Sequence, residues 1–189
     1  MRIAIPNLKG IVAAIALALA FSAPAVAQQA DLTDESDLLA RLAQADPAEA
    51  KQIDRQLQAL WSKSGSAAAD LLLKRGREAL EDDNTRAAIE HLTALTDHAP
   101  GFSEGWHARA SAFFAAGLYG PAIADLERAL ALNPHNYDAI FGLGLIFESV
   151  DRPEQAYRAY SRALAIHPHH EEVTKAMNRL ESGVAGQSL

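Results

Sequence analysis

The sequence predicts an all-α fold, an α-solenoid of three helix–turn–helix repeats with an N-terminal helical hairpin and a C-terminal capping helix. The first observation is that Pro100, Pro134 and Pro168 lie 34 residues apart. The second is that an alanine precedes each proline by twelve residues, and a large apolar residue precedes it by eight. These residues are Ala88, Ala122 and Ala156, and then Leu92, Leu126 and Tyr160. A 34-residue period closed by proline is typical of stacked helix pairs.

Each repeat is expected to form two antiparallel helices, neither of which can bury its apolar face without neighbours. Small residues are needed where the two helices cross closely, and the sequence places Gly76, Ala110 and Gly144 there. The repeats cover residues 69–102, 103–136 and 137–170. Their first helices are expected to begin near Ala69, Ser103 and Tyr137, and their second helices near Thr85, Tyr119 and Pro153.

These residues resemble the tetratricopeptide repeat family over 102 of the 189 residues. The third repeat carries the fullest motif: Ile140, Leu143, Gly144, Phe147, Ala156, Tyr160, Ala163 and Pro168. The resemblance implies a right-handed solenoid and extends to small exported proteins of this type in alpha-proteobacteria. The sequence departs from the family pattern with Arg75 and Arg109 at a leucine position, and with Leu95 at a small one.

Residues 1–27 are typical of a cleavable secretory signal. Arg2 and Lys9 give a positive start, eleven apolar residues follow from Ile11 to Phe21, and Ala25-Val26-Ala27 forms an A-x-A cleavage site. A membrane anchor is the alternative, but the apolar run is short of the roughly 20 residues that cross a bilayer. We therefore expect export to the periplasm, with no stable membrane insertion after cleavage.

Residues 28–68 are predicted to form a linker and a helical hairpin. Asp46-Pro47-Ala48-Glu49 is a strong start for its second helix, with an N-cap aspartate and a proline in the first turn. Because terminal repeats need a polar outer face, the hairpin is interpreted as a degenerate capping pair. A loosely attached helical extension is the alternative. Residues 171–182 are expected to form the capping helix, and residues 183–189 a disordered tail.

The resemblance implies that the first helices of the repeats line a concave groove that receives a partner peptide or helix. The groove residues are expected to be Leu73, Lys74, Arg77, His107, Ser111, Phe114, Phe141, Leu145 and Glu148, with Leu80, Glu104 and Asp138 beside them. Phe114, Phe141 and Leu145 would form an apolar floor between basic and acidic ends. The alternative is that the two phenylalanines only pack against the neighbouring helix.

Composition limits the other classes of function. The formal charge is −7, and it becomes −9 without Arg2 and Lys9, which disfavours nucleic acid as a partner. No catalytic motif and no cofactor motif occurs, so we expect no enzyme activity and no cofactor. The chain contains no cysteine, which excludes disulfides and a lipid-modified cysteine.

The sequence therefore predicts a protein-interaction adaptor or scaffold in the cell envelope. Two alternatives remain at this stage. One is a metal-binding protein that uses histidines of the inter-repeat turns, with His98, His135, His167, His169 and His170 as candidates. The other is an array that self-associates, for which a homodimer would bury the groove or the last helix.

Overall fold

The computed structural model describes residues 35–186, and within them every regular element is a helix. Residues 35–42 are helical. They are followed by α3 (Pro47–Trp61), α4 (Ala67–Glu81), α5 (Thr85–His98), α6 (Ser103–Ala115), α7 (Tyr119–Leu132), α8 (Tyr137–Ser149), α9 (Pro153–Ile166) and α10 (Glu171–Gly186). The predicted signal, the linker and residues 187–189 lie outside the described residues. The predicted all-α solenoid is confirmed.

The helix boundaries follow local signals in the sequence. Five of the six predicted starts coincide with the observed ones, and α4 begins at Ala67 instead of Ala69. The earlier start of α4 arises because the side chain of Ser66 caps the helix by accepting a hydrogen bond from the Ala69 amide. Asp46 caps α3 as expected, accepting from the amides of Ala48 and Glu49.

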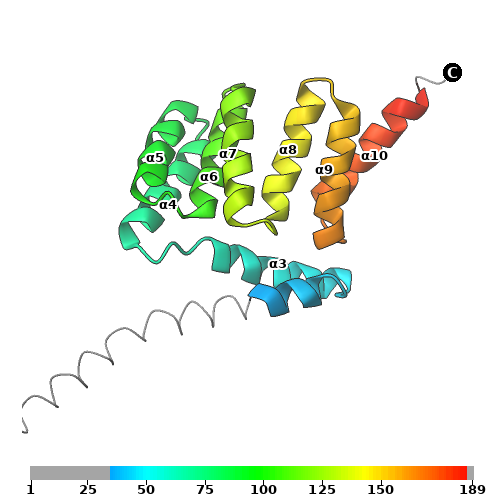
Figure 1. Cartoon of the computed structure of the whole chain (residues 1–189), viewed down its shortest axis with the longest axis horizontal. Coiled ribbons are helices and arrows are strands. Elements are labelled where there is room, and N and C mark those ends of the chain that lie inside the picture. Colours follow the sequence, from blue (N-terminus) through cyan, green and yellow to red (C-terminus); the bar gives the residue numbers. More distant parts are fainter. Residues whose placement is uncertain (1–34, 187–189) are drawn as a thin grey trace, which may run out of the picture.

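Helices α4 to α9 stand side by side as three antiparallel pairs, α4/α5, α6/α7 and α8/α9 (Figure 1). Turns between the two helices of a pair lie at one end of the array. Turns between successive pairs lie at the other end, next to α3. Each pair contacts its neighbour through α5 with α6 and α7 with α8, which is the stacking that a repeat array requires.

Close approach within a pair depends on the predicted small residues. A side-chain carbon added at Gly76 would overlap the isobutyl group of Leu92, and one at Gly144 would overlap the ring of Tyr160. Leu92 and Tyr160 are fully buried. The small residue of the first helix and the large residue of the second therefore occupy complementary volumes.

The bulky Leu95 is accommodated by a glycine in the next repeat. Leu95 is fully buried, and a side-chain carbon on Gly105 of α6 would lie 3.1 Å from its Cγ atom. In the second repeat the position of Leu95 is held by Ala129, and the position facing it on α8 is held by Ala139. The larger side chain of Leu95 on α5 is therefore compensated by the absence of a side chain at Gly105 on α6, and the first repeat is still tightly packed.

Arg109, at the leucine position of the second repeat, forms a buried polar joint. Its guanidinium donates to both carboxylate oxygens of Asp125 on α7, at 2.7 and 2.9 Å, and to the hydroxyl of Thr96 on α5 at 2.8 Å. It also lies over the ring of Trp106, 4.9 Å from the centroid. Asp125 and Thr96 are 5% and 2% exposed, so the departure from leucine is compensated by partners on two helices.

Helix α10 continues the register as an additional first helix. Val173 and Ala176 are buried against the third repeat, 34 residues after Ala139 and Gly142. The helix runs to Gly186, so residues 183–186 are helical and the expectation of a disordered tail from residue 183 is wrong for them. Gly183 alone does not end the helix because an isolated glycine costs only about 1 kcal/mol in a helix interior.

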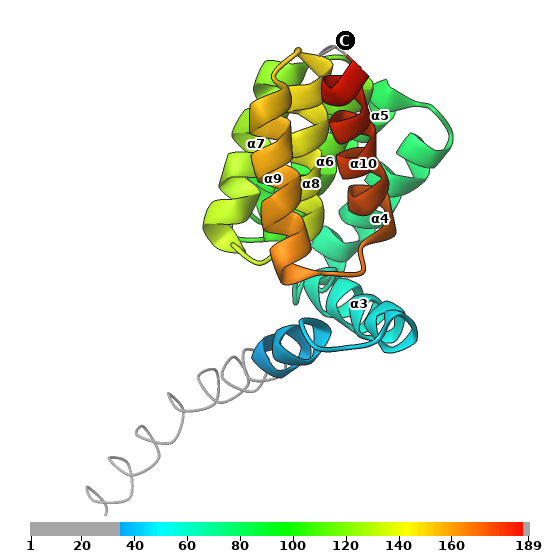
Figure 2. The same ribbon diagram turned by 90° about the vertical axis from the view of Figure 1, so that its right-hand side faces the viewer.

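The N-terminal hairpin does not stack on the first repeat. Figures 1 and 2 show α3 and residues 35–42 lying across the end of the array where successive pairs are joined. Trp61 packs on Tyr137 of the third repeat, with ring centroids 5.2 Å apart, and the Tyr137 hydroxyl donates to Asp54 at 2.5 Å. Both earlier interpretations, a capping pair and a loose extension, are therefore wrong.

The outer face of α4 explains why no hairpin stacks there. In α6 and α8 the positions facing the preceding repeat are small or apolar, among them Ala108, Ala112 and Ile146. The equivalent residues of α4 are Lys74 and Glu78, whose side chains pair at 3.6 Å. The first repeat thus ends the array by itself, because a packed neighbour would desolvate these charges.

No helix within residues 35–186 has the length and apolar character needed to cross a membrane.

Two glycines of α8 provide a matched test of the packing. Gly144→Ala should lower the free energy of unfolding by about 1–3 kcal/mol relative to Gly142→Ala. The reason is that the methyl group added at residue 144 overlaps the buried ring of Tyr160, whereas the one added at residue 142 overlaps no ring. At Gly142 the nearest atoms, on Leu126, lie at 3.4 Å, an ordinary contact. Urea denaturation of both variants measures the difference, and equal stabilities would contradict the close approach at Gly144.

Candidate functional site

A pocket of about 170 Å³ opens between α6 and α8, with Leu126 of α7 behind it. It brings together five of the nine predicted groove residues, His107, Ser111, Phe114, Phe141 and Leu145, and also Asp138. Residues one helical turn apart on two adjacent helices meet here because successive first helices run side by side. This pocket is the candidate site.

The walls of the pocket are apolar and partly exposed. Phe114, Phe141 and Leu145 all retain some solvent accessibility. Phe141 also packs on Tyr160 and His170, with ring centroids 5.6 Å away in each case, and Phe114 packs on Tyr119 at 5.8 Å. The phenylalanines therefore serve the packing of the array and also line the pocket.

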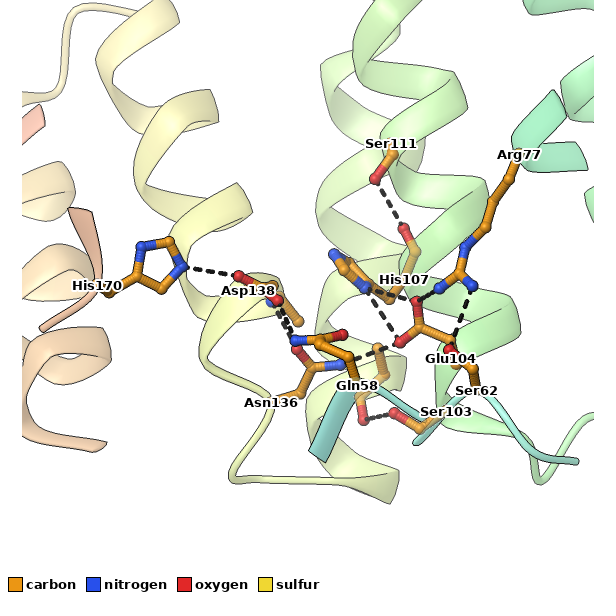
Figure 3. Close-up of polar contacts among 12 residues, drawn as sticks. Gln58, Ser62, Arg77, Ser103, Glu104, His107, Ser111, Asn136, Asp138 and His170 are labelled. Atoms are coloured by element: carbon orange, nitrogen blue, oxygen red, sulfur yellow. Dashed lines mark hydrogen bonds and ion pairs between the residues drawn. The ribbon is translucent and has the colours of Figure 1, made fainter. Parts of the chain in front are cut away.

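The polar side of the pocket is built on the buried carboxylate of Glu104 (Figure 3). Glu104 is 3% exposed and accepts hydrogen bonds from Arg77 at 2.5 Å and from Nδ1 of His107 at 3.2 Å. Asn136, the N-cap of α8, adds a weaker contact at 3.4 Å. One polar network thus joins the first helices of the three repeats, with Arg77 from α4, Glu104 and His107 from α6 and Asn136 from the N-cap of α8.

Charge pairing sets the protonation of this network. Burial alone would raise the pKa of the Glu104 carboxyl, but His107 and Arg77 hold that pKa below its usual range. Burial alone would lower the pKa of His107, but the Glu104 carboxylate outweighs it and raises that pKa. His107 therefore holds its proton to a higher pH than a free histidine.

The second ring nitrogen of His107 is left for a ligand. Nδ1 is fixed by Glu104, and within residues 35–186 Nε2 has no hydrogen-bond partner. Figure 3 shows the ring turned so that this nitrogen points away from Glu104. A protonated Nε2 can donate one hydrogen bond beside apolar walls, an arrangement suited to a side chain or backbone carbonyl of a bound segment.

Asp138, on the opposite side of the pocket, is already held by two partners. Its carboxylate accepts from Nε2 of His170 at 2.9 Å and from the amide of Gln58 on α3 at 2.6 Å. Burial would raise the pKa of Asp138, but His170, His107 and Gln58 lower it overall. The N-terminal hairpin therefore reaches the rim of the candidate site.

The remaining predicted groove residues lie outside the pocket. Leu73 is 3% exposed and belongs to the core between α4, α5 and α6, so its assignment to an open groove is wrong. Lys74 lies on the outer face of α4. Glu148 accepts two hydrogen bonds from Arg179 of α10, both at 2.8 Å, and Arg179 holds the pKa of Glu148 below its usual range.

The charged side chains that were expected to form a basic and an acidic end of the groove are therefore paired with other residues of the chain. Arg77 pairs with Glu104, Asp138 with His170, and Glu148 with Arg179. Sequence reasoning missed Gln58 and Ser62, which bond Asp138 and Arg77 from the hairpin side. No local signal could have identified them, because each bonds a residue of a different helix, 80 positions away for Gln58 and 15 positions away for Ser62.

The histidines of the inter-repeat turns come together only in part: His167, His169 and His170 line one pocket, and the rings of His167 and His170 lie 5.2 Å apart between centroids. His98, His135 and His169 are exposed, His167 is buried, and His170 is committed to Asp138. In the described part of the chain no group of three or more histidine, aspartate or glutamate side chains is arranged to hold a metal ion. The metal-binding alternative gains no support from this geometry.

Comparison with known proteins agrees with the repeat architecture. Residues 113–180 match a family model described as tetratricopeptide repeat. A TPR repeat-containing protein of Rhizobium etli is 28% identical over 141 residues, which cover 75% of this chain and 69% of that protein. The resemblance found in the sequence is confirmed.

Solved structures show the same fold. The crystal structure of MamA superposes with a TM-score of 0.58 and 27% identity, over 62% of this chain and 68% of that one. The first TPR domain of Spaghetti (RPAP3), solved with the HSP90 peptide SRMEEVD, superposes with a TM-score of 0.60 and 26% identity. That match covers 64% of this chain and 95% of the Spaghetti domain.

The pairing of Glu104 with His107 can be tested by titration. In Glu104→Gln the pKa of His107 should fall from above to below about 6.5, because burial persists while the attraction of the carboxylate is lost. Two-dimensional NMR of the imidazole nitrogens measures both values. Ser111→Ala, which keeps the carboxylate, should leave the pKa of His107 raised. A raised pKa in Glu104→Gln would rule out Glu104 as its cause.

Proposed function

We propose that this chain, a solenoid of tetratricopeptide repeats, is a protein-interaction adaptor that holds a segment of a partner protein on its concave face. The observation that carries the proposal is the pocket between α6 and α8, which is lined by three apolar side chains and by His107, whose Nε2 has no hydrogen-bond partner within residues 35–186. The peptide bound to the Spaghetti domain supports the general mode of binding. We infer no catalytic step.

The pocket defines the chemistry of the partner segment. Its volume of about 170 Å³ suits one large apolar side chain, inserted between Phe114, Phe141 and Leu145. Nε2 of His107 would donate to a carbonyl or carboxylate next to that anchor residue. Because the flanking charges are paired within the chain, shape and this single donor would contribute more to recognition than long-range charge.

We further propose that the protein works in the cell envelope after export. The support is the pattern of residues 1–27, in which a positive start and an apolar run precede Ala25-Val26-Ala27. In this proposal the adaptor would bring envelope proteins together for assembly or upkeep of membrane or cell-wall machinery.

Partner binding can be tested by blocking the pocket without disturbing the core. Ser111 is exposed on the pocket rim and donates to the backbone carbonyl of His107. Ser111→Arg should reduce capture of envelope proteins at least tenfold, because the long side chain fills the entrance. Quantitative mass spectrometry of affinity-purified material measures the loss.

Ser161→Arg is the matched control. Ser161 lies on α9, makes the same backbone hydrogen bond to a residue four positions earlier, and does not line the pocket. Capture should therefore be unchanged in this variant, with both proteins equally helical by circular dichroism. Equal capture by Ser111→Arg and Ser161→Arg would exclude the pocket as the binding site.

Export can be tested separately by expressing the full chain in a bacterium. The mature protein should appear in the periplasmic fraction with Gln28 as its first residue, because signal peptidase cleaves after A-x-A. Ala27→Tyr should block cleavage while Ala30→Tyr, three residues beyond the site, should not. A protein that stays full-length in the membrane fraction would contradict cleavage and favour an anchor.

A further inference from the structure

The interface between the N-terminal hairpin and the third repeat buries a histidine whose hydrogen bonding is incomplete. His167 is 5% exposed, and its Nδ1 atom has no partner among the described residues. Its ring meets Tyr137 edge-on, with centroids 5.0 Å apart, and Tyr137 is the residue on which Trp61 of the hairpin packs. His167 therefore lies directly behind the contact that holds the hairpin in place.

Charged and titratable side chains surround His167 from α3, α8, α10 and the turn before α10. A pocket of about 340 Å³ beside the ring is lined by Lys51, Asp54 and Gln58 of α3, Asp138 of α8, His169 and His170 of the turn, and Glu171 and Glu172 of α10. Most of these groups are already paired: Asp54 with the Tyr137 hydroxyl, Asp138 with His170 and Gln58, and Lys51 with Glu171 at 2.7 Å.

The Nδ1–H group of a protonated His167 would have no hydrogen-bond acceptor among the described residues. The nearest carboxylates have partners, and the ring of His170 lies 5.2 Å away, centroid to centroid, where a second positive charge would repel it. A buried charge without a partner is unfavourable, so the protein can relieve it by admitting water to the interface.

We propose that His167 is a proton-operated latch, whose protonation releases the hairpin of residues 35–61 from the third repeat. Release separates Trp61 from Tyr137 and Gln58 from Asp138. The freed rim at Asp138 belongs to the pocket between α6 and α8, so the hairpin controls one side of that site. The latch can be tested without knowledge of any partner.

The direction of the effect follows from proton linkage. Burial lowers the pKa of His167, His170 lowers it further, and Asp54 and Asp138 offset this only in part. The docked state therefore binds the proton more weakly than the released state. Docking is at full strength above about pH 6.5, the usual pKa of histidine, and weakens as the pH falls below it. One proton changes the docking equilibrium by at most about tenfold per pH unit.

Trp61 can report this release directly. The chain contains two tryptophans, so Trp106→Phe leaves Trp61 as the single fluorophore. Trp61 is 9% exposed and donates its indole N–H to Glu35. In the full chain its emission should shift to longer wavelength as the pH falls from about 7.5 to 5, reversibly and with no loss of helix by circular dichroism.

Three variants in the Trp106→Phe background identify the group responsible. His167→Phe fills the same space without a titrating group, and His167→Gln keeps polarity without a charge, so both should abolish the shift. His169→Gln, in the same turn but exposed, should retain it. A shift that persists in both His167 variants would overturn the proposal. The absence of any shift in the parent protein before helix is lost would also overturn it.

Discussion

The whole array depends on how closely the two helices of a pair approach each other. At Gly76 and Gly144 the approach is so close that the partner side chain, Leu92 or Tyr160, occupies the space of a missing methyl group. This contact fixes the crossing within a pair, and the crossing fixes which residues face the next pair. The alignment of α6 beside α8, and with it the pocket, follows from that geometry.

Features set by local chemistry could be predicted from the sequence. Helix starts followed from caps and prolines, as at Asp46 and Pro153, and the repeat period located the small residues at the crossings. The five residues that meet in the pocket were also identified, because the repeat register determines which residues of α6 and α8 face the groove. These inferences needed only local signals and the recurrence of one 34-residue pattern along the chain.

Features set by distant pairings could not be predicted. The position of the hairpin depends on contacts such as Trp61 with Tyr137, which have no signature in either segment alone. The ionic pairs of Arg77 with Glu104 and of Glu148 with Arg179 likewise join separate helices. A charged side chain that becomes buried needs a partner of opposite charge or a hydrogen-bond partner. The sequence does not show whether a ligand or another part of the same chain provides that partner.

The crossing of the hairpin from the first repeat to the third also changes how the molecule should come apart. In an open array each repeat touches only its neighbours, so the ends can fray independently. Here the Gln58–Asp138 and Asp54–Tyr137 hydrogen bonds join residues 80 and 83 positions apart. The hairpin, which precedes the first repeat in the chain, is thereby also bonded to the third repeat. Unfolding of the hairpin then destabilises the third repeat, and unfolding of the third repeat destabilises the hairpin, so the repeats unfold as one cooperative unit. The same contacts should slow folding, because forming them requires the closure of a long loop at a cost in entropy.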